Sequence, residues 1–158
     1  MKKIVKILTV AISALLVLTA CSGKSETKDI SVADTTKSVL EATTLVGELV
    51  EISDKNVDLL YTKFDKSIIG EYKIYACASK ATCEEIAIFK ATDKANVEKI
   101  TEIAKQRVAD LITENKDYNP NEMTKLDSPL ITSKGNYVLL VIADDTAPAQ
   151  EAFSKAFK

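Results

Sequence analysis

The chain contains no histidine and no tryptophan, and it has only one arginine and four glycines among 158 residues. Without histidine, neither a histidine-based catalytic triad nor a histidine metal site can form. The single arginine, Arg107, leaves no set of arginines to clamp phosphate or carboxylate groups. Common phosphate-loop, hydrolase and zinc-protease motifs are also missing (GxxxxGK(S/T), GxGxxG, GxSxG, HExxH). These absences argue against an enzyme of a familiar type.

The first twenty residues have the layout of a secretory signal peptide that ends at a lipidation site. Lys2, Lys3 and Lys6 precede an uncharged, largely apolar run over residues 7–18. As a helix this run would measure about 18 Å, too short for a membrane core of roughly 30 Å. The tetrapeptide at 18–21, Leu-Thr-Ala-Cys, looks like the lipobox of bacterial lipoproteins, in which the cysteine, here Cys21, receives a diacylglyceryl group and the peptidase cuts before it. The alternative is an ordinary signal peptide that happens to precede a cysteine.

We therefore expect a signal peptide over 1–20, a lipidated Cys21 with a polar tether over 21–29, and a single domain over 30–158. Cleavage removes three lysines and no acidic residue, so the net charge changes from −2 to −5. An acidic domain is poorly suited to nucleic acid, and no nucleic-acid partner is expected. Two acyl chains give stable anchoring, so we expect the protein on the outer face of the cytoplasmic membrane, held there through Cys21.

Apolar periodicity and capping residues predict four helices. The first is expected over 31–44, with Ser31 suited to its start, and the second over 54–64. The longest is expected over 93–115, where an apolar stripe faces away from a charged side. The last is expected over 147–157.

Alternating sequences between these helices predict two β-hairpins, 71–77 with 83–90 and 130–133 with 137–143. Gly135 and the following asparagine suit a tight turn with positive φ. Residues 137–143 are apolar at every position, which indicates a strand covered on both faces. The sequence therefore predicts an α+β fold with a four-stranded antiparallel sheet: two hairpins joined by the long helix and packed with the N- and C-terminal helices.

The two remaining cysteines, Cys77 and Cys83, flank the connection of the first hairpin. Symmetric pairing about Lys80 places them opposite each other and sets Ile74 against Ile86. Directly opposed Cβ atoms lie about 4.5–5.5 Å apart, close to what a disulfide needs. The prediction is a structural disulfide worth about 2 kcal/mol. Free thiols and a redox-active pair are the alternatives, although the spacing is not CxxC. Two cysteines without histidine lack the usual ligands of zinc, so we expect neither a metal nor a cofactor.

Several stretches resemble one family in their order and spacing, from about residue 30 to residue 145. The stretches are Glu84–Phe89 (EEIAIF), Asp117–Pro120 (DYNP), Lys125–Leu126 and Gly135–Val138 (GNYV). The family is domain of unknown function 4358, whose members are mostly small lipoproteins of clostridia and their relatives. The resemblance implies an anchored protein with one domain, and it implies no activity, substrate or catalytic residue. Cys77 and Cys83 depart from its pattern, which has small or polar residues there.

Four residues form the candidate binding surface: Tyr118, Asn119, Asn136 and Tyr137. They combine the loop after the long helix with a hairpin tip, and loops on a rigid scaffold often carry function. The alternative is that Tyr118 packs over the sheet edge and Asn136 only forms the turn. No catalytic residue is predicted, because the adjacent carboxylates of residues 84–85 would point to opposite faces of a strand.

Three functions remain open at this point. The leading hypothesis is a non-enzymatic, membrane-anchored module that binds an envelope protein, a peptide or a small ligand. The second is an envelope enzyme of unfamiliar type, a hydrolase that uses carboxylates from distant segments. The third is a thiol redox protein that uses Cys77 and Cys83.

Overall fold

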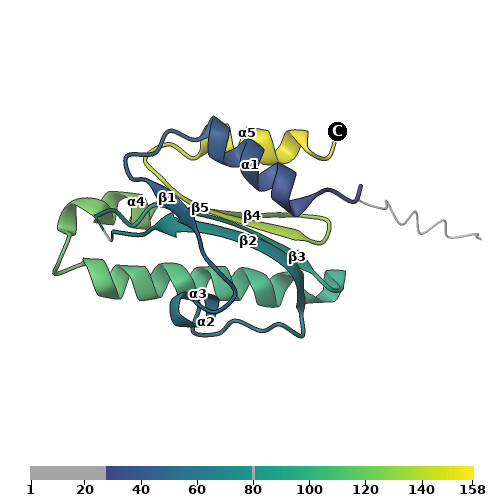
Figure 1. Cartoon of the computed structure of the whole chain (residues 1–158), viewed down its shortest axis with the longest axis horizontal. Helices are drawn as coiled ribbons and strands as arrows, with labels where there is room; N and C mark the ends of the chain where they lie inside the picture. Colours follow the sequence, from purple (N-terminus) through teal and green to yellow (C-terminus); the bar gives the residue numbers. More distant parts are fainter. Residues whose placement is uncertain (1–27, 80) are drawn as a thin grey trace, which may run out of the picture.

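A five-stranded antiparallel sheet forms the middle layer of the structure (Figure 1). This computed structural model describes residues 28–79 and 81–158. The α+β class is confirmed, whereas the expected four strands are one too few. In order across the sheet, the strands are β1 (Leu49–Glu51), β2 (Ile69–Cys77), β3 (Glu85–Ala91), β5 (Tyr137–Ile142) and β4 (Leu130–Lys134).

Strand β1 was missed because it has only three residues and lies at the edge of the sheet. It pairs with the end of β2, with Leu49 opposite Cys77 and Glu51 opposite Tyr75. Three residues are too few for a period-two pattern to stand out in the sequence. The two predicted hairpins do form, and they meet through β3 and β5.

The register of the β2–β3 hairpin differs by one residue from the predicted register. Ala76 lies opposite Glu85 and Ile74 opposite Ala87, so the expected pairing of Ile74 with Ile86 was wrong. Every residue of β3 except Lys90 is buried, because helices cover both faces of the sheet. A strand that is apolar on both faces specifies its register weakly, since a shift by one residue exposes nothing to water.

Apolar residues of β5 point alternately into two cores, as expected for a strand covered on both faces. Val138, Leu140 and Ile142 join one cluster, and Leu139 and Val141 join the other. The β4–β5 turn has Gly135 at φ 60°, which confirms the predicted turn with positive φ.

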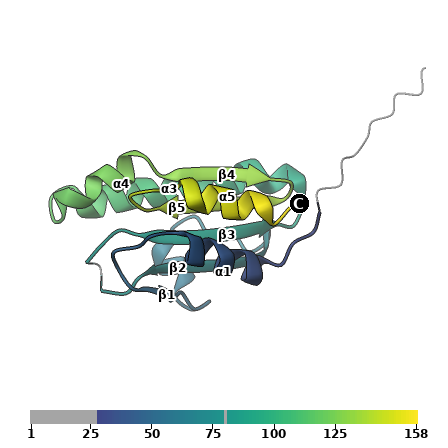
Figure 2. The same cartoon turned by 90° about the horizontal axis from the view of Figure 1, so that it is seen from above.

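Helices cover both faces of the sheet (Figures 1 and 2). Helix α1 (Val32–Ala42) and helix α5 (Ala147–Lys155) pack against one face, and helix α3 (Val97–Asn115) with the single-turn helix α2 (Val57–Leu60) covers the other. Ser31 caps α1 as predicted, because its hydroxyl accepts a hydrogen bond from the Asp34 backbone N–H.

Two helical details differ from the prediction. The helix expected over 54–64 shrinks to one turn, because Tyr61 leaves the helical conformation (φ −113°, ψ 89°) and packs its ring against Phe89. The short helix α4 (Met123–Asp127), which follows the 3₁₀ turn Pro120–Glu122, was not predicted. A second 3₁₀ turn, Lys94–Asn96, leads into α3.

The described chain begins at one end of the sheet, which we call the tether end. There Asp29 accepts hydrogen bonds from Lys90, at 2.7 Å, and from the Tyr137 hydroxyl. Lys90 pairs with Tyr137 in the β3–β5 ladder, whereas Glu85 pairs with Ile142 at the opposite end. Glu85 and Lys90 are five residues apart along β3, so the two ends are separated by about 17 Å. We call the end with Glu85 the far end. None of the helices in the described part of the chain combines the length and hydrophobicity needed to cross a membrane.

Candidate functional site

Two adjacent carboxylates at the start of β3 lie on opposite sides of the sheet at the far end. Glu84 forms an ion pair with Lys125 of α4, and Glu85 forms one with Arg107 of α3. Both glutamates are only 1% exposed. A buried charge is costly unless it is paired and hydrogen-bonded, so these two pairs fix the surrounding segments.

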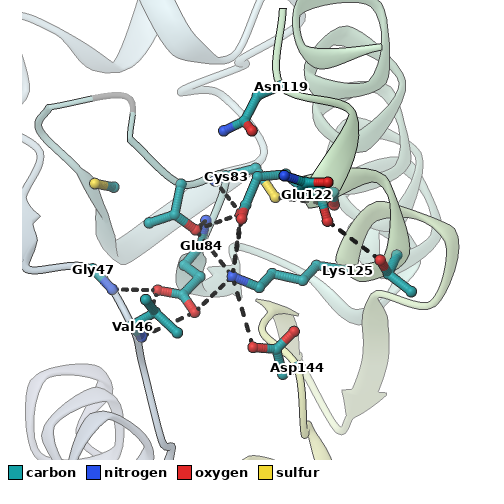
Figure 3. A network of polar contacts seen from close by, with 12 residues as sticks. Val46, Gly47, Cys83, Glu84, Asn119, Glu122, Lys125 and Asp144 are labelled. Carbon is teal, nitrogen blue, oxygen red and sulfur yellow. Dashed lines mark hydrogen bonds and ion pairs between the residues drawn. The ribbon is translucent and has the colours of Figure 1, made fainter.

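The Glu84 carboxylate connects three segments that are distant in the sequence (Figure 3). It accepts a hydrogen bond from Lys125 Nζ at 3.1 Å and others from the backbone N–H groups of Val46 and Gly47 at 2.8–3.1 Å. A Cβ on Gly47 would lie 2.4 Å from the Thr82 methyl group, so only glycine allows this close approach. The loop before β1 is therefore held against the start of β3 by one side chain.

Glu122 completes this network from the 3₁₀ turn before α4. Its carboxylate accepts hydrogen bonds from the Thr82 hydroxyl at 2.5 Å, the Cys83 backbone N–H at 3.0 Å and Lys125 Nζ at 3.2 Å. Burial alone would raise the pKa of Glu122, but these hydrogen bonds outweigh it and lower the pKa to about 2. For the Lys125 ammonium, burial alone would lower the pKa, but the hydrogen bonds to Glu84 and Glu122 raise it. Both groups are therefore charged at neutral pH.

The second ion pair lies on the α3 side of the sheet. Arg107 Nε and Nη2 donate to Glu85 at 3.0 and 2.8 Å, and Nη1 donates to the Leu60 carbonyl at 3.3 Å. The Tyr61 hydroxyl also donates to the Glu85 carboxylate. Arg107 is 6% exposed although it is the only arginine of the chain. The burial of Arg107 was not predicted from the sequence; its position four residues before Leu111 and next to Val108, on the buried side of α3, is the signal that could have indicated it.

A cavity of about 710 Å³ opens at the far end, between the β2–β3 connection, α2 and the C-terminal half of α3. We call it the cleft. Glu85 and Arg107 line it, and Leu59 and Tyr118 stand at it with 77% and 82% of their surfaces exposed. The apolar part of the wall is completed by Ile52, Leu60, Ala76, Ala78 and Leu111. The cleft therefore combines an apolar wall with buried, fully paired charges.

The structure does not bring the four residues of the predicted binding surface together. Tyr118 and Asn119 lie at the far end, where the Asn119 amide donates to the Ala81 carbonyl at 3.2 Å. Asn136 and Tyr137 lie at the tether end, and Tyr137 is buried with its hydroxyl bonded to the Ile30 backbone. Tyr118 and Asn119 follow the C-terminus of α3, whereas Asn136 and Tyr137 lie at the β4–β5 turn, at the other end of the sheet. Tyr118 is exposed beside the cleft instead of packing over the sheet edge.

The predicted disulfide is absent, and Cys77 and Cys83 are free. Strand β3 begins at Glu85, so Cys83 lies outside the ladder and its N–H bonds Glu122. Burial, reinforced by the Glu122 carboxylate, raises the pKa of the Cys83 thiol to about 12. The predicted lipidation site, Cys21, lies outside the described residues. Within residues 28–79 and 81–158, no three acidic or cysteine side chains are grouped so that they could hold a metal ion.

The lowered pKa of Glu122 predicts a specific dependence of stability on pH. Because the pKa of Glu122 in the folded state, about 2, lies below the ordinary glutamate value of 4.5, the unfolded state binds the proton first as the pH falls. The ionised Glu122 carboxylate therefore contributes about 3 kcal/mol to the free energy of unfolding. This contribution is complete above pH 4.5 and is lost as the pH approaches 2. In Glu122→Gln, we expect the free energy of unfolding to fall less steeply between these pH values, as measured by urea titrations.

The matched control is Glu71→Gln, which removes an exposed carboxylate at the start of β2 and should keep the wild-type pH dependence. Other carboxylates with a lowered pKa, such as Glu51, remain in both variants. An unchanged slope in Glu122→Gln would contradict the role assigned to this side chain.

Comparison with known protein families finds a match to one of them. Its profile, described as a domain of unknown function (DUF4358), matches residues 42–143. The matched region begins at the last residue of α1 and ends just after β5, so it includes the whole sheet, both ion pairs and the cleft. A search of curated proteins and a search of solved structures found no match. The chain belongs to the DUF4358 family.

Proposed function

We propose that this protein is a lipoprotein of the cell envelope, anchored through Cys21 on the outer face of the cytoplasmic membrane, whose domain binds a ligand in the cleft. The anchor rests on the basic start, the apolar run and the lipobox-like residues 18–21. The observation that carries the binding function is the cleft itself, with Leu59 and Tyr118 exposed beside it. Its volume lies in the range of about 300–1,000 Å³ that is typical of ligand pockets.

The state of the buried carboxylates favours binding over hydrolysis. A carboxylate hydrolase needs one carboxyl group that donates a proton and a second that attacks or activates water. Glu84 and Glu85 are instead each held by a cation and by further donors, Gly47 N–H on one side and the Tyr61 hydroxyl on the other. In this arrangement they stabilise the walls of the cleft.

The cysteines give no support to a redox function. The thiolate is the form that attacks a disulfide, and a pKa of about 12 keeps Cys83 protonated at neutral pH. For Cys77, burial alone would raise the pKa, but bonds from Ser79 and nearby backbone N–H groups lower it. Cys83 therefore supplies little attacking thiolate, and no disulfide joins it to Cys77.

The position of the tether supports a cleft that faces away from the membrane. Asp29 is bonded to Lys90 and Tyr137 at the tether end, whereas the cleft opens at the far end. A domain held at the tether end would present the cleft to the envelope space. A ligand could then reach it without entering the membrane surface.

The anchor is tested by changing Cys21 to serine. We expect Cys21→Ser to abolish incorporation of an alkyne-labelled fatty acid in growing cells, because serine lacks the thiol that receives the lipid. Mass spectrometry of the wild type should find the mature protein beginning at residue 21. Cys77→Ser is the matched control and should be labelled like the wild type. Labelling of Cys21→Ser, or none in the wild type, would contradict the anchor.

The cleft is tested by photo-cross-linking in intact cells with p-benzoylphenylalanine at position 118. Because Tyr118 is 82% exposed beside the cleft, the substitution should not disturb the core. We expect a light-dependent adduct of one defined mass, identified by mass spectrometry. The same cross-linker at position 71, exposed on β2 near the tether end, is the control and should not form this adduct. No adduct at position 118, or the same adducts at both positions, would contradict the proposed function.

A further inference from the structure

We infer that the occupant of the cleft is a basic peptide segment of a partner protein, with an apolar side chain next to lysine or arginine. This inference rests on the proposed function and specifies the chemistry of the ligand. Two independent features of the far end support it: where apolar side chains are exposed, and how charge is balanced across this end of the domain.

The large apolar side chains that the described part of the chain exposes all lie at the far end. Leu59 and Tyr118 line the cleft, and Val50 lies opposite Ala76, which also lines it. The fourth exposed apolar residue is Val46, whose backbone N–H donates a hydrogen bond to the Glu84 carboxylate. Exposed apolar side chains gathered in one region mark a surface that contacts another molecule. The spread of these residues beyond the cleft favours a peptide over a compact small molecule.

Carboxylates outnumber cations at the far end as a whole, both in the cleft on the α3 side of the sheet and in a separate cavity on the α4 side that Lys125 and Asp144 line. Lys125 is shared by three of them, Glu84 at 3.1 Å, Glu122 at 3.2 Å and Asp144 at 3.8 Å. Figure 3 shows these groups around a single ammonium. One cation therefore faces three anions, and the excess negative charge remains at the surface, since Asp144 is largely exposed.

Glu114 adds a further carboxylate in the cleft itself. It lies on the exposed side of the last turns of α3, one turn beyond Leu111, and lines the cavity. Arg107, the cation that lines the same cavity, is already paired with Glu85. A ligand with positive charge would be attracted to this end, and an apolar side chain beside that charge would fill the space between Leu59 and Tyr118.

The test measures binding of three fluorescent peptides to the full chain in neutral detergent. The probe is acetyl-Lys-Lys-Leu-Phe-Lys-Lys-amide. One control replaces its lysines with glutamates, and the other replaces Leu-Phe with Ser-Ser. We expect the probe to bind at least about tenfold more tightly than either control in fluorescence anisotropy, and we expect added salt to weaken it.

Variants locate the binding on the protein. Tyr118→Ala and Glu114→Lys should each raise the Kd of the probe by about tenfold, because they remove an apolar contact and reverse a charge at the cleft. The matched control is Glu102→Lys, the same charge reversal on an exposed position of α3 about 18 Å away along the helix. It should change the Kd by less than about twofold.

Three results would overturn the inference. The glutamate peptide could bind as tightly as the probe, or Glu102→Lys could weaken binding as much as Glu114→Lys. Sedimentation could also show that the chain associates with itself and that Glu114→Lys prevents this, in which case a second copy fills the cleft. If no peptide binds while the cross-linker at position 118 still forms its adduct, the ligand chemistry is wrong and the proposed function stands. If both fail, the proposed function fails as well.

Discussion

The buried ion pair between Glu84 and Lys125 is the contact on which the far end of the domain depends. It joins the loop before β1, the start of β3 and helix α4, which are separated by about 40 residues on either side of Glu84. The loop before β1 and helix α4 are short, and helix α4 has only five residues, so local structure alone would hold them weakly. Because the paired charges are taken out of water, removing either partner leaves the other uncompensated, and the three segments are held in place together.

Glu85 and Arg107 apply the same constraint on the opposite face of the sheet. Together the two ion pairs fix the walls of the cleft at the point where β2 ends and β3 begins, while Leu59 and Tyr118 remain outside the core. The buried ion pairs that hold the walls and the exposed side chains that would contact a ligand are therefore different residues. A ligand that uses the exposed side chains gains affinity without disturbing the buried charges, and walls that are already ordered reduce the entropy lost on binding.

The sequence predicts elements that are long or strongly periodic and misses what depends on distant contacts. The helix ending at Asn115 and the turn at Gly135 follow from local patterns, and both are present. Strand β1 and helix α4 are too short for such a pattern. The register of β2 on β3 is weakly specified by local pattern because β3 is covered on both faces, and the one-residue error in the predicted register led to the incorrect Cys77–Cys83 disulfide. Alternation along a strand placed the two glutamates on opposite faces, but it could not identify Lys125 and Arg107 as their partners.

The most direct test of this account is a double-mutant cycle between Glu84 and Lys125, with Glu84→Gln and Lys125→Met measured singly and together by urea unfolding. Each single variant should lose about 3–5 kcal/mol of stability, because it leaves a buried charge without its partner. The double variant should lose clearly less than the sum, with a coupling energy of about 1–3 kcal/mol. If the two losses add to within about 0.5 kcal/mol, the ion pair does not hold the far end together and the central claim is contradicted.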